Sequence, residues 1–465
     1  GENTMRNLLS LLLACLTAIT LTGCGLKSGE DLYQLPKASA EYGSLQTCLE
    51  DILDRGLEYS APLTGSNLQS VQLTDLDNDG TDEAIAFFRD SSAESQSLKI
   101  YIFRQIEPNR YAPALVIEGN GTAINSVVVC QLQGGSDSMR ELLISWQLSP
   151  TVYALSAYSL DNYNLTEMLS SSTYTKYTVD DLNQDGNDEI VLIQLRTSDQ
   201  DSNRADYYVA EGGRMTMHNS VFLSKKLSSI DRVTCSPLPN RHTALYVTGS
   251  ALAPSGEVSS STVITDILAV QEEDLTNISM GKGELNSSAT LRSNLTQEQD
   301  INSDGIIEIP IPSLVESYGQ SAGKEKFYSL HWQQYDISGA FHLACSTYHN
   351  TNDGWYLMCP NHWTGHISLM RTENTSSATM EHGIVFYYRG SKRDTPTPFL
   401  AIYKTTSSDR QSRFDRTQKS GRFVLRSESN AVYSAEFFDC DWDCGLTEDT
   451  LKEQFHLIQP HWSND

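Results

Sequence analysis

Basic residues are scarce in this chain. Its 465 residues include 33 Lys and Arg against 59 Asp and Glu, which gives a formal net charge of −26 at pH 7. Proteins that bind nucleic acid neutralise phosphates with clustered Lys and Arg, and no such cluster is seen. The composition therefore argues against a nucleic-acid partner and suits an exported protein in a cation-rich setting.

Long apolar runs are also scarce. The one that stands out covers residues 8–21 and is shorter than the roughly 20 residues that a membrane-spanning helix needs. It follows a short basic segment and ends in Leu-Thr-Gly-Cys at Cys24, which predicts a secretory signal over residues 5–23. This ending resembles the signals of bacterial lipoproteins and implies that Cys24 is lipidated. We therefore expect a lipid-anchored protein on the extracytoplasmic face of a bacterial cell membrane, with residues 24–43 as a tether.

Familiar catalytic motifs are missing as well. The chain has no G-x-S-x-G elbow, no H-E-x-x-H helix, no P-loop and no dinucleotide fingerprint. An envelope hydrolase acting on glycan or peptide stays open as an alternative, because a glycosidase needs only two carboxylates brought together by the fold. His349, His362 and His366 lie near two tryptophans and could line a sugar or metal pocket, although ordinary packing is the simpler interpretation.

The cysteines cannot all pair with one another. Apart from Cys15 in the predicted signal and Cys24, seven remain, which is an odd number. Cys440 and Cys444 could close a small disulfide loop or contribute, with histidines further along the chain, to a zinc site. Their spacing matches no zinc-finger or zinc-ribbon pattern, so neither alternative is favoured.

Against these absences, one nine-residue pattern occurs three times. Oxygen donors at positions 1, 3 and 5, a backbone carbonyl at 7 and a carboxylate at 9 can surround a hard cation, and Gly at 6 permits the sharp turn. The pattern therefore predicts about three bound Ca²⁺ ions. The predicted ligands are Asp75, Asp77, Asp79, Thr81 and Glu83; Asp181, Asn183, Asp185, Asn187 and Glu189; and Asp300, Asn302, Asp304, Ile306 and Glu308.

These loops differ from the calcium loops that join two helices. An EF-hand needs Glu at position 12, where this chain has Ala86, Leu192 and Ile311. Instead, the ninth-position Glu begins an apolar run in each copy, so the loop is predicted to join two strands. The acids at position 8, Asp82 and Asp188, are expected to face solvent.

The loops belong to a longer array of repeats. Copies of the strand-loop-strand pattern begin at residues 75, 131, 181, about 235 and 300, and the copies at Gln131 and near Cys235 lack the acids and are expected to bind no metal. Each copy is followed by a second pair of strands around a tight turn. Four strands in a unit of about 50 residues, repeated five times, are typical of a β-propeller. The predicted turns are Pro108-Asn109, Asp161-Asn162, Gly212-Gly213, Glu272-Glu273 and Ile337-Ser338.

These loops and their spacing resemble the FG-GAP and VCBS repeat families, whose propeller blades carry D-x-[DN]-x-D-G-x-x-[DE] loops. The resemblance covers the signal and residues 65–350. Together with the predicted lipidation at Cys24, it makes the chain similar to VCBS-repeat lipoproteins of gut Firmicutes. It implies the propeller fold and calcium, but it implies no single activity, because such folds host adhesins, binding proteins and enzyme appendages.

The predicted architecture is mainly β: a β-propeller of about five FG-GAP-like blades followed by a small α+β domain. A helix over residues 44–55 precedes the array, and both lie in residues 44–350. Residues 351–465 are predicted to form six strands and a final helix over 447–458, capped by Thr447. We expect a binding or scaffold module with a glycan or protein ligand rather than an enzyme.

Overall fold

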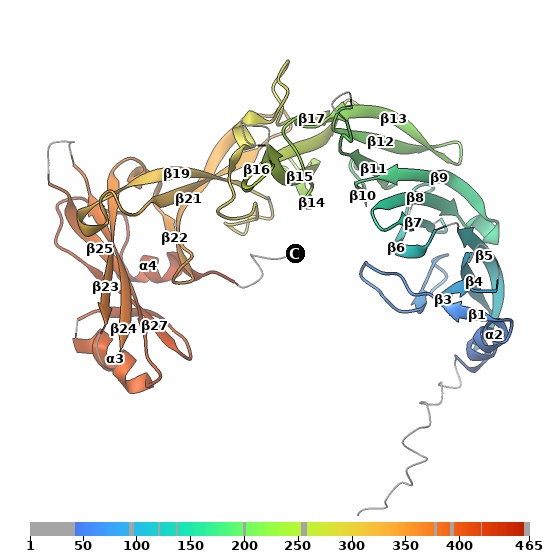
Figure 1. Cartoon of the computed structure of the whole chain (residues 1–465), viewed down its shortest axis with the longest axis horizontal. Coiled ribbons are helices and arrows are strands. Elements are labelled where there is room, and N and C mark those ends of the chain that lie inside the picture. Colours follow the sequence, from blue (N-terminus) through green and yellow to red (C-terminus); the bar gives the residue numbers. More distant parts are fainter. Residues whose placement is uncertain are drawn as a thin grey trace, which may run out of the picture. The chain divides into compact units, whose positions relative to one another are not determined.

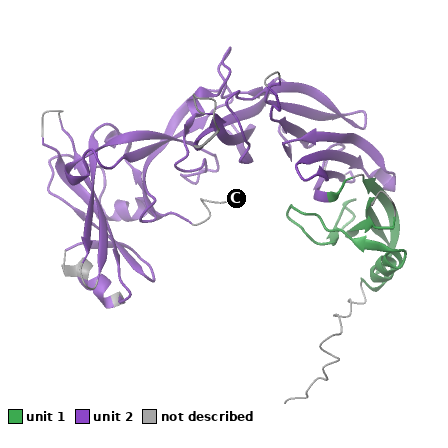
Figure 2. Ribbon diagram, viewed as in Figure 1, with its two compact units in different colours: residues 1–123 green, residues 124–465 purple. Residues whose placement is uncertain are grey.

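The computed structural model describes residues 42–459 except 93–96, 120, 136–137, 199–200, 253–257, 376–378, 391–394 and 420. The predicted signal, the predicted lipidation site Cys24 and most of the predicted tether lie outside the described residues. The fold is mainly β, as predicted, and nearly all of its strand pairs are antiparallel. The chain divides into two compact units, residues 1–123 and 124–465 (Figure 2).

The described residues of the first unit form one helix and one sheet (Figure 1). The sheet has the order β1-β3-β4-β5, and β2 also pairs with β3. The predicted helix is confirmed, and it buries Leu45 and Ile52 in a cluster with Phe88 and Phe103. The elements are α2 (Gly43–Leu53), β1 (Leu57–Tyr59), β2 (Val71–Thr74), β3 (Glu83–Asp90), β4 (Leu98–Glu107) and β5 (Arg110–Gly119).

The second unit begins with three separate sheets, each built around four consecutive antiparallel strands. The first contains β6 (Ala123–Cys130), β7 (Glu141–Ser149), β8 (Val152–Ser159) and β9 (Thr166–Tyr174). The second contains β10 (Lys176–Asp180), β11 (Glu189–Gln194), β12 (Arg204–Glu211) and β13 (Arg214–Phe222). The third contains β14 (Arg232–Pro237), β15 (Thr243–Leu252), β16 (Val258–Gln271) and β17 (Asp274–Asn277), with β18 (Arg292–Ser293) paired to β16.

A ten-stranded sheet completes the second unit, in the order β26-β27-β25-β24-β23-β19-β20-β21-β22-β28. Its two halves meet where β19 runs parallel to β23, through the pairs Glu316 with Ser368 and Ser317 with Leu369. The strands are β19 (Ile309–Ser317), β20 (Phe327–Tyr335), β21 (Phe341–Asn350), β22 (Trp355–Cys359), β23 (Ile367–Thr375), β24 (Met380–Tyr388), β25 (Thr397–Thr406), β26 (Phe423–Ser427), β27 (Ala431–Phe437) and β28 (Phe455–Leu457).

Five runs of four consecutive, paired strands therefore occur in the described chain: β2–β5, β6–β9, β10–β13, β14–β17 and β19–β22, the last of them within the ten-stranded sheet. All five predicted turns lie between paired strands: four join the third and fourth strands of a run, and Ile337-Ser338 joins β20 and β21, the second and third strands of the last run. The 3₁₀ turn at 161–163 accommodates Asn162 with φ of 51°. Three more 3₁₀ turns occur in the described residues, at Ser288–Thr290, Gly319–Ser321 and Asn361–Trp363.

The C-terminal region differs from its prediction in three respects. Strand β22, assigned to the C-terminal domain by the division at 350/351, pairs with β21 as the fourth strand of the fifth unit. The final helix is α4 (Glu448–Gln454), capped by Thr447 as predicted, but it ends early because residues from Phe455 extend as β28 and pair with β22. A third helix, α3 (Arg410–Lys419), was not predicted, since its sequence carries almost no apolar stripe.

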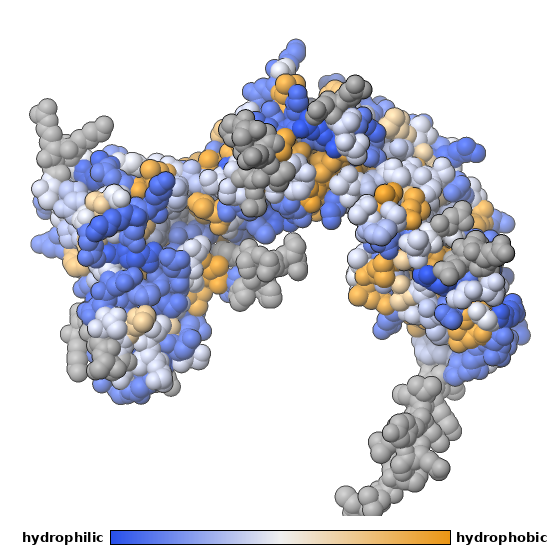
Figure 3. All heavy atoms as spheres, in the orientation of Figure 1, coloured by the Kyte–Doolittle hydropathy of each residue, from blue (hydrophilic) through white to orange (hydrophobic). Residues whose placement is uncertain are grey.

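Hydrophilic side chains cover much of the face shown in Figure 3, with hydrophobic ones in scattered patches. The described helices all fall short of the length and apolar content that a membrane span requires. The apolar residues are instead buried between and upon the sheets. The largest cluster joins the two halves of the ten-stranded sheet and includes Trp355 from β22, Phe386 from β24, and Trp363.

Candidate metal centres

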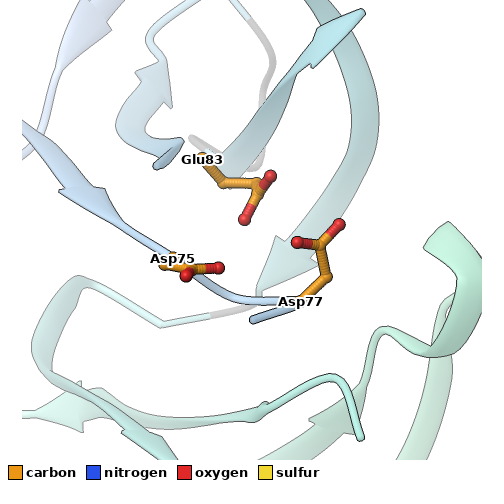
Figure 4. A group of neighbouring side chains, drawn as sticks. All are labelled: Asp75, Asp77 and Glu83. Atoms are coloured by element: carbon orange, nitrogen blue, oxygen red, sulfur yellow. The ribbon is translucent and has the colours of Figure 1, made fainter. Parts of the chain in front are cut away.

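The first predicted loop brings three carboxylates together between β2 and β3. Oxygens of Asp75, Asp77 and Glu83 lie within 4.8 Å of one another, and the side chains point toward a common centre (Figure 4). The backbone N–H of Leu76 donates to Glu83 Oε2 at 2.8 Å, and that of Gly80 donates to Asp75 Oδ2 at 3.0 Å. These bonds hold the first and ninth positions of the loop on one side of the turn.

The second and third loops repeat this geometry between β10 and β11 and before β19. The carboxylates that meet within 4.8 Å are Asp181, Asp185 and Glu189 in one loop and Asp300, Asp304 and Glu308 in the other. The corresponding backbone bonds are Leu182 N to Glu189 Oε2 at 2.9 Å, Gly186 N to Asp181 Oδ2 at 3.0 Å, Ile301 N to Glu308 Oε2 at 3.0 Å and Gly305 N to Asp300 Oδ2 at 2.8 Å.

The three loops also share their backbone conformation. The glycine at position 6 has φ of 86°, 92° and 87° in the three copies, the left-handed region in which a Cβ is strained. Position 4 lies in the same region, with φ of 59° at Asn78, 63° at Gln184 and 62° at Ser303, a feature that the sequence did not disclose. The pattern thus encodes one loop shape three times.

The donor groups fit a bound cation. Asp75 Oδ1 is buried and has no hydrogen-bond partner, so the folded loop leaves an anionic oxygen unsatisfied. Glu83, Glu189 and Glu308 are only 2%, 3% and 0% exposed. Burial, reinforced by the neighbouring aspartates, raises the pKa of both Glu189 and Glu308 to about 7. A cation among these groups would offset both the burial and the mutual repulsion.

Not every predicted ligand joins a cluster. Asp79 lies outside the first carboxylate group, and its Oδ1 accepts the backbone N–H of Thr81 at 2.7 Å. Asn183 and Asn302 donate from Nδ2 to the position-5 aspartates, at 3.2 and 3.0 Å. In each loop, the position-5 aspartate also accepts the backbone N–H of the position-7 residue, which is Thr81, Asn187 or Ile306. The carbonyls of these position-7 residues remain predicted ligands.

The loop at Gln131 keeps part of this frame without the aspartates. Leu132 is buried, and its N–H donates to Glu141 Oε2 at 2.8 Å, as the second and ninth positions do in the acidic loops. Glu141 begins β7 and is 1% exposed. The prediction that this copy lacks the acids is wrong at this position. The loop is two residues longer, so Glu141 falls outside the nine-residue spacing.

The copy near Cys235 has lost all of the acids. Its buried Leu238 corresponds to Leu132 and Leu182, and Pro237 pairs with Thr243 where the acidic loops have their first and ninth positions. The N–H of Leu238 donates to the carbonyl of His242 at 2.7 Å. A backbone carbonyl thus takes the place of the glutamate.

Asp82 is exposed, as predicted, but the prediction that Asp188 faces solvent is wrong, because this residue is partly buried. The Asp188 carboxylate accepts the N–H of Gln131 at 2.8 Å, and its own N–H donates to the Gln131 carbonyl at 2.6 Å. Asn187 Oδ1 also accepts the N–H of Gly135 at 3.0 Å. The second acidic loop is therefore bonded to the acid-poor loop of the preceding sheet.

Two side chains outside the loops approach the acids. Gln334, on β20, donates from Nε2 to Asp304 Oδ2 at 2.7 Å and to Glu308 Oε1 at 2.6 Å. Burial and the charge of Glu189 raise the pKa of Tyr207, on β12, well above its ordinary value. Neither contact could be predicted from the sequence, because both depend on the pairing of a neighbouring strand.

The histidine group is not assembled. His349 stacks on Tyr356 with ring centroids 4.9 Å apart, and burial lowers its pKa to about 4. His362 instead lies near Trp442, and its Nε2 is 3.2 Å from the Asp443 carbonyl. Within the described residues, the three acidic loops are the groups of His, Cys, Asp or Glu with a metal-binding arrangement.

Comparison with known proteins adds little. No protein-family model matches the chain, and no curated protein matches it. A solved complex of the fission yeast SREBP and SCAP binding domains is similar over 83% of this chain and 80% of that chain, with 10% sequence identity and a TM-score of 0.23. A similarity of this size supports no conclusion about shared fold or function.

Proposed function

We propose that the chain is an exported, lipid-anchored binding protein whose five four-stranded units are the blades of a β-propeller stabilised by about three Ca²⁺ ions. The observation that carries this proposal is the repetition of one acidic loop, in which a buried glutamate and two aspartates meet at the entry to β3, β11 and β19. Oxygen-only donor sets favour hard cations, and their number and spacing suit Ca²⁺.

The calcium proposal is tested by stoichiometry. Isothermal titration should count about three ions in the wild-type chain, and Asp75→Ala, Asp181→Ala and Asp300→Ala should each remove about one. Asp82→Ala is the matched control, because this exposed acid lies in the first loop but outside the carboxylate group. Undiminished stoichiometry in all three variants would exclude the loops as the calcium sites.

The anchoring proposal rests on the predicted signal and Cys24. Cys24→Ser should leave an unprocessed precursor in the cell, whereas the wild type should fractionate with membranes as a processed, lipid-bearing protein. Native protein recovered free in the medium with residues before Cys24 intact would rule out the anchor.

The ligand is proposed to be a glycan or a protein bound by connections from several blades. Binding should then survive any single Asp, Glu, His or Ser substitution outside the three loops. Screening the wild-type protein on a glycan array, followed by such variants, tests this. A variant that folds normally but loses a hydrolytic turnover shown by the wild type would replace the binding role with an enzymatic one.

A further inference from the structure

The third acidic loop has a polar neighbour that belongs to another strand. Gln334 is 4% exposed, and its Nε2 donates to both Asp304 and Glu308, at 2.7 and 2.6 Å. Both acceptors are members of the third carboxylate group. A buried side-chain amide therefore lies against two of the three acids.

Strand register explains why Gln334 reaches these acids. Ile309 pairs with Gln333 in the β19–β20 ladder, so Gln334 lies beside Glu308 where the ladder begins. In the second loop Ile190 pairs with Tyr208, which places Val209 at the corresponding position beside Glu189. At the cross-strand position beside the last glutamate, the third loop therefore has a polar glutamine and the second loop an apolar valine.

The chemistry of an amide suits both states of such a loop. Without a cation, the N–H donors of Gln334 separate carboxylates that repel one another. A cation among the same carboxylates repels N–H groups and attracts oxygen. Rotation about the last side-chain bond exchanges the amide nitrogen and oxygen while the rest of the side chain stays in place, and that bond has broad rotational freedom.

We propose that Gln334 is an additional ligand of the third metal site, which supplies its amide oxygen from outside the nine-residue loop. This inference rests on the proposed calcium function. It makes the three sites unequal, with the third binding Ca²⁺ more tightly than the second. The difference arises from one residue on a neighbouring strand.

The test isolates single sites in the full chain. Asp75→Ala with Asp181→Ala leaves the third site, whose Ca²⁺ dissociation constant is measured by isothermal titration. Adding Gln334→Leu should weaken binding about 10-fold, the lower end of the effect of losing a supporting group at a metal site. Adding Gln334→Glu, which keeps an oxygen and adds a charge, should instead tighten binding.

A reciprocal variant tests the same position in the second site. In the Asp75→Ala, Asp300→Ala background, Val209→Gln should tighten Ca²⁺ binding relative to Val209 itself. Melting temperatures in saturating Ca²⁺ and near-ultraviolet circular dichroism show whether each variant is folded. If Gln334→Leu weakens Ca²⁺ binding and Val209→Gln tightens it, Gln334 acts as a ligand and not through packing. A packing defect at the third site would give no reason for glutamine to improve binding at the second site.

Different failures have different meanings. If folded Gln334→Leu binds Ca²⁺ as tightly as its background or more tightly, the amide is a competitor or a bystander, and the inference is overturned. The same conclusion follows if Gln334→Glu weakens binding. If the background with Gln334 intact binds no Ca²⁺, the proposed calcium function itself fails.

Discussion

The loops at residues 181–189 and 131–141 are alike at their second and last positions but differ at the other positions. Both bury a leucine at the second position, and both bond its N–H to a buried glutamate that starts the next strand. Only the first has aspartates at positions 1 and 5. The strand-loop-strand frame therefore forms with or without these aspartates, and only in the acidic loop would a cation offset repulsion between neighbouring carboxylates.

Removal of the proposed calcium ions should lower the stability of the protein most, because it acts on all three acidic loops at once and on no other loop. Each site should contribute about 2.7 kcal/mol to the free energy of unfolding when free Ca²⁺ is 100-fold above its dissociation constant. Excess chelator should thus lower the melting temperature of the wild type. In the control with Asp75→Ala, Asp181→Ala and Asp300→Ala combined, chelator should change nothing. An unchanged wild-type melting temperature would contradict the cation requirement.

Truncation of the shared leucine should act equally on both kinds of loop. Leu132→Ala and Leu182→Ala remove side chains that are 1% and 3% exposed, and each should lower the free energy of unfolding by about 2–5 kcal/mol. Denaturant titration in saturating Ca²⁺ measures both. A loss confined to Leu182→Ala would show that the acid-poor loop is not held by the same frame.

The pH dependence should be a smaller effect and specific to the acidic loops. Burial raises the pKa of Glu189 and Glu308 to about 7, from an ordinary value of 4.5. Their contribution to stability is therefore fully present below pH 4.5 and is lost as the pH rises through 7. In chelator, the melting temperature should fall across this window, while Ca²⁺ should oppose the fall.

Glutamine substitution provides the control for this titration. Glu189→Gln with Glu308→Gln removes both carboxyl groups, so the metal-free protein should lose most of the fall in melting temperature between pH 4.5 and 7. If the doubly substituted protein keeps the full pH dependence, other groups are responsible.

The contact between the two loops should produce the smallest effect. Asp188→Ala removes the acceptor of the Gln131 N–H, which should lower the free energy of unfolding by about 1 kcal/mol. Asp82→Ala, at the same position of the first loop but exposed, should stay within about 0.5 kcal/mol of the wild type. If the two substitutions change the free energy of unfolding equally, the contact between Asp188 and Gln131 does not contribute to stability.

Features held within a short stretch of chain could be predicted from the sequence. The acidic loops, their glycines and the five tight turns depend on residues close in sequence, and the mainly β fold follows from the apolar runs that flank them. The calcium, the propeller closure and the anchor stay predictions.

What could not be predicted depends on partners far along the chain. The role of Glu141 could not be predicted because two extra residues shift its spacing in the loop. The prediction that Asp188 faces solvent was wrong because its partner, Gln131, lies 57 residues away in the sequence. Gln334 approaches the third loop through strand pairing alone. The final helix was predicted too long because the pairing of Phe455 with Leu357 favours an extended chain over the helical pattern.

The position of β22 has a practical consequence for anyone who divides the protein. A cut at 350/351, where the sequence alone suggests a boundary, would remove the strand that pairs with β21 along residues 346–350. The N-terminal fragment would then display a bare row of backbone donors and acceptors, a template for edge-to-edge aggregation. A fragment that extends through Cys359 would retain this strand and should be the better-behaved piece in solution.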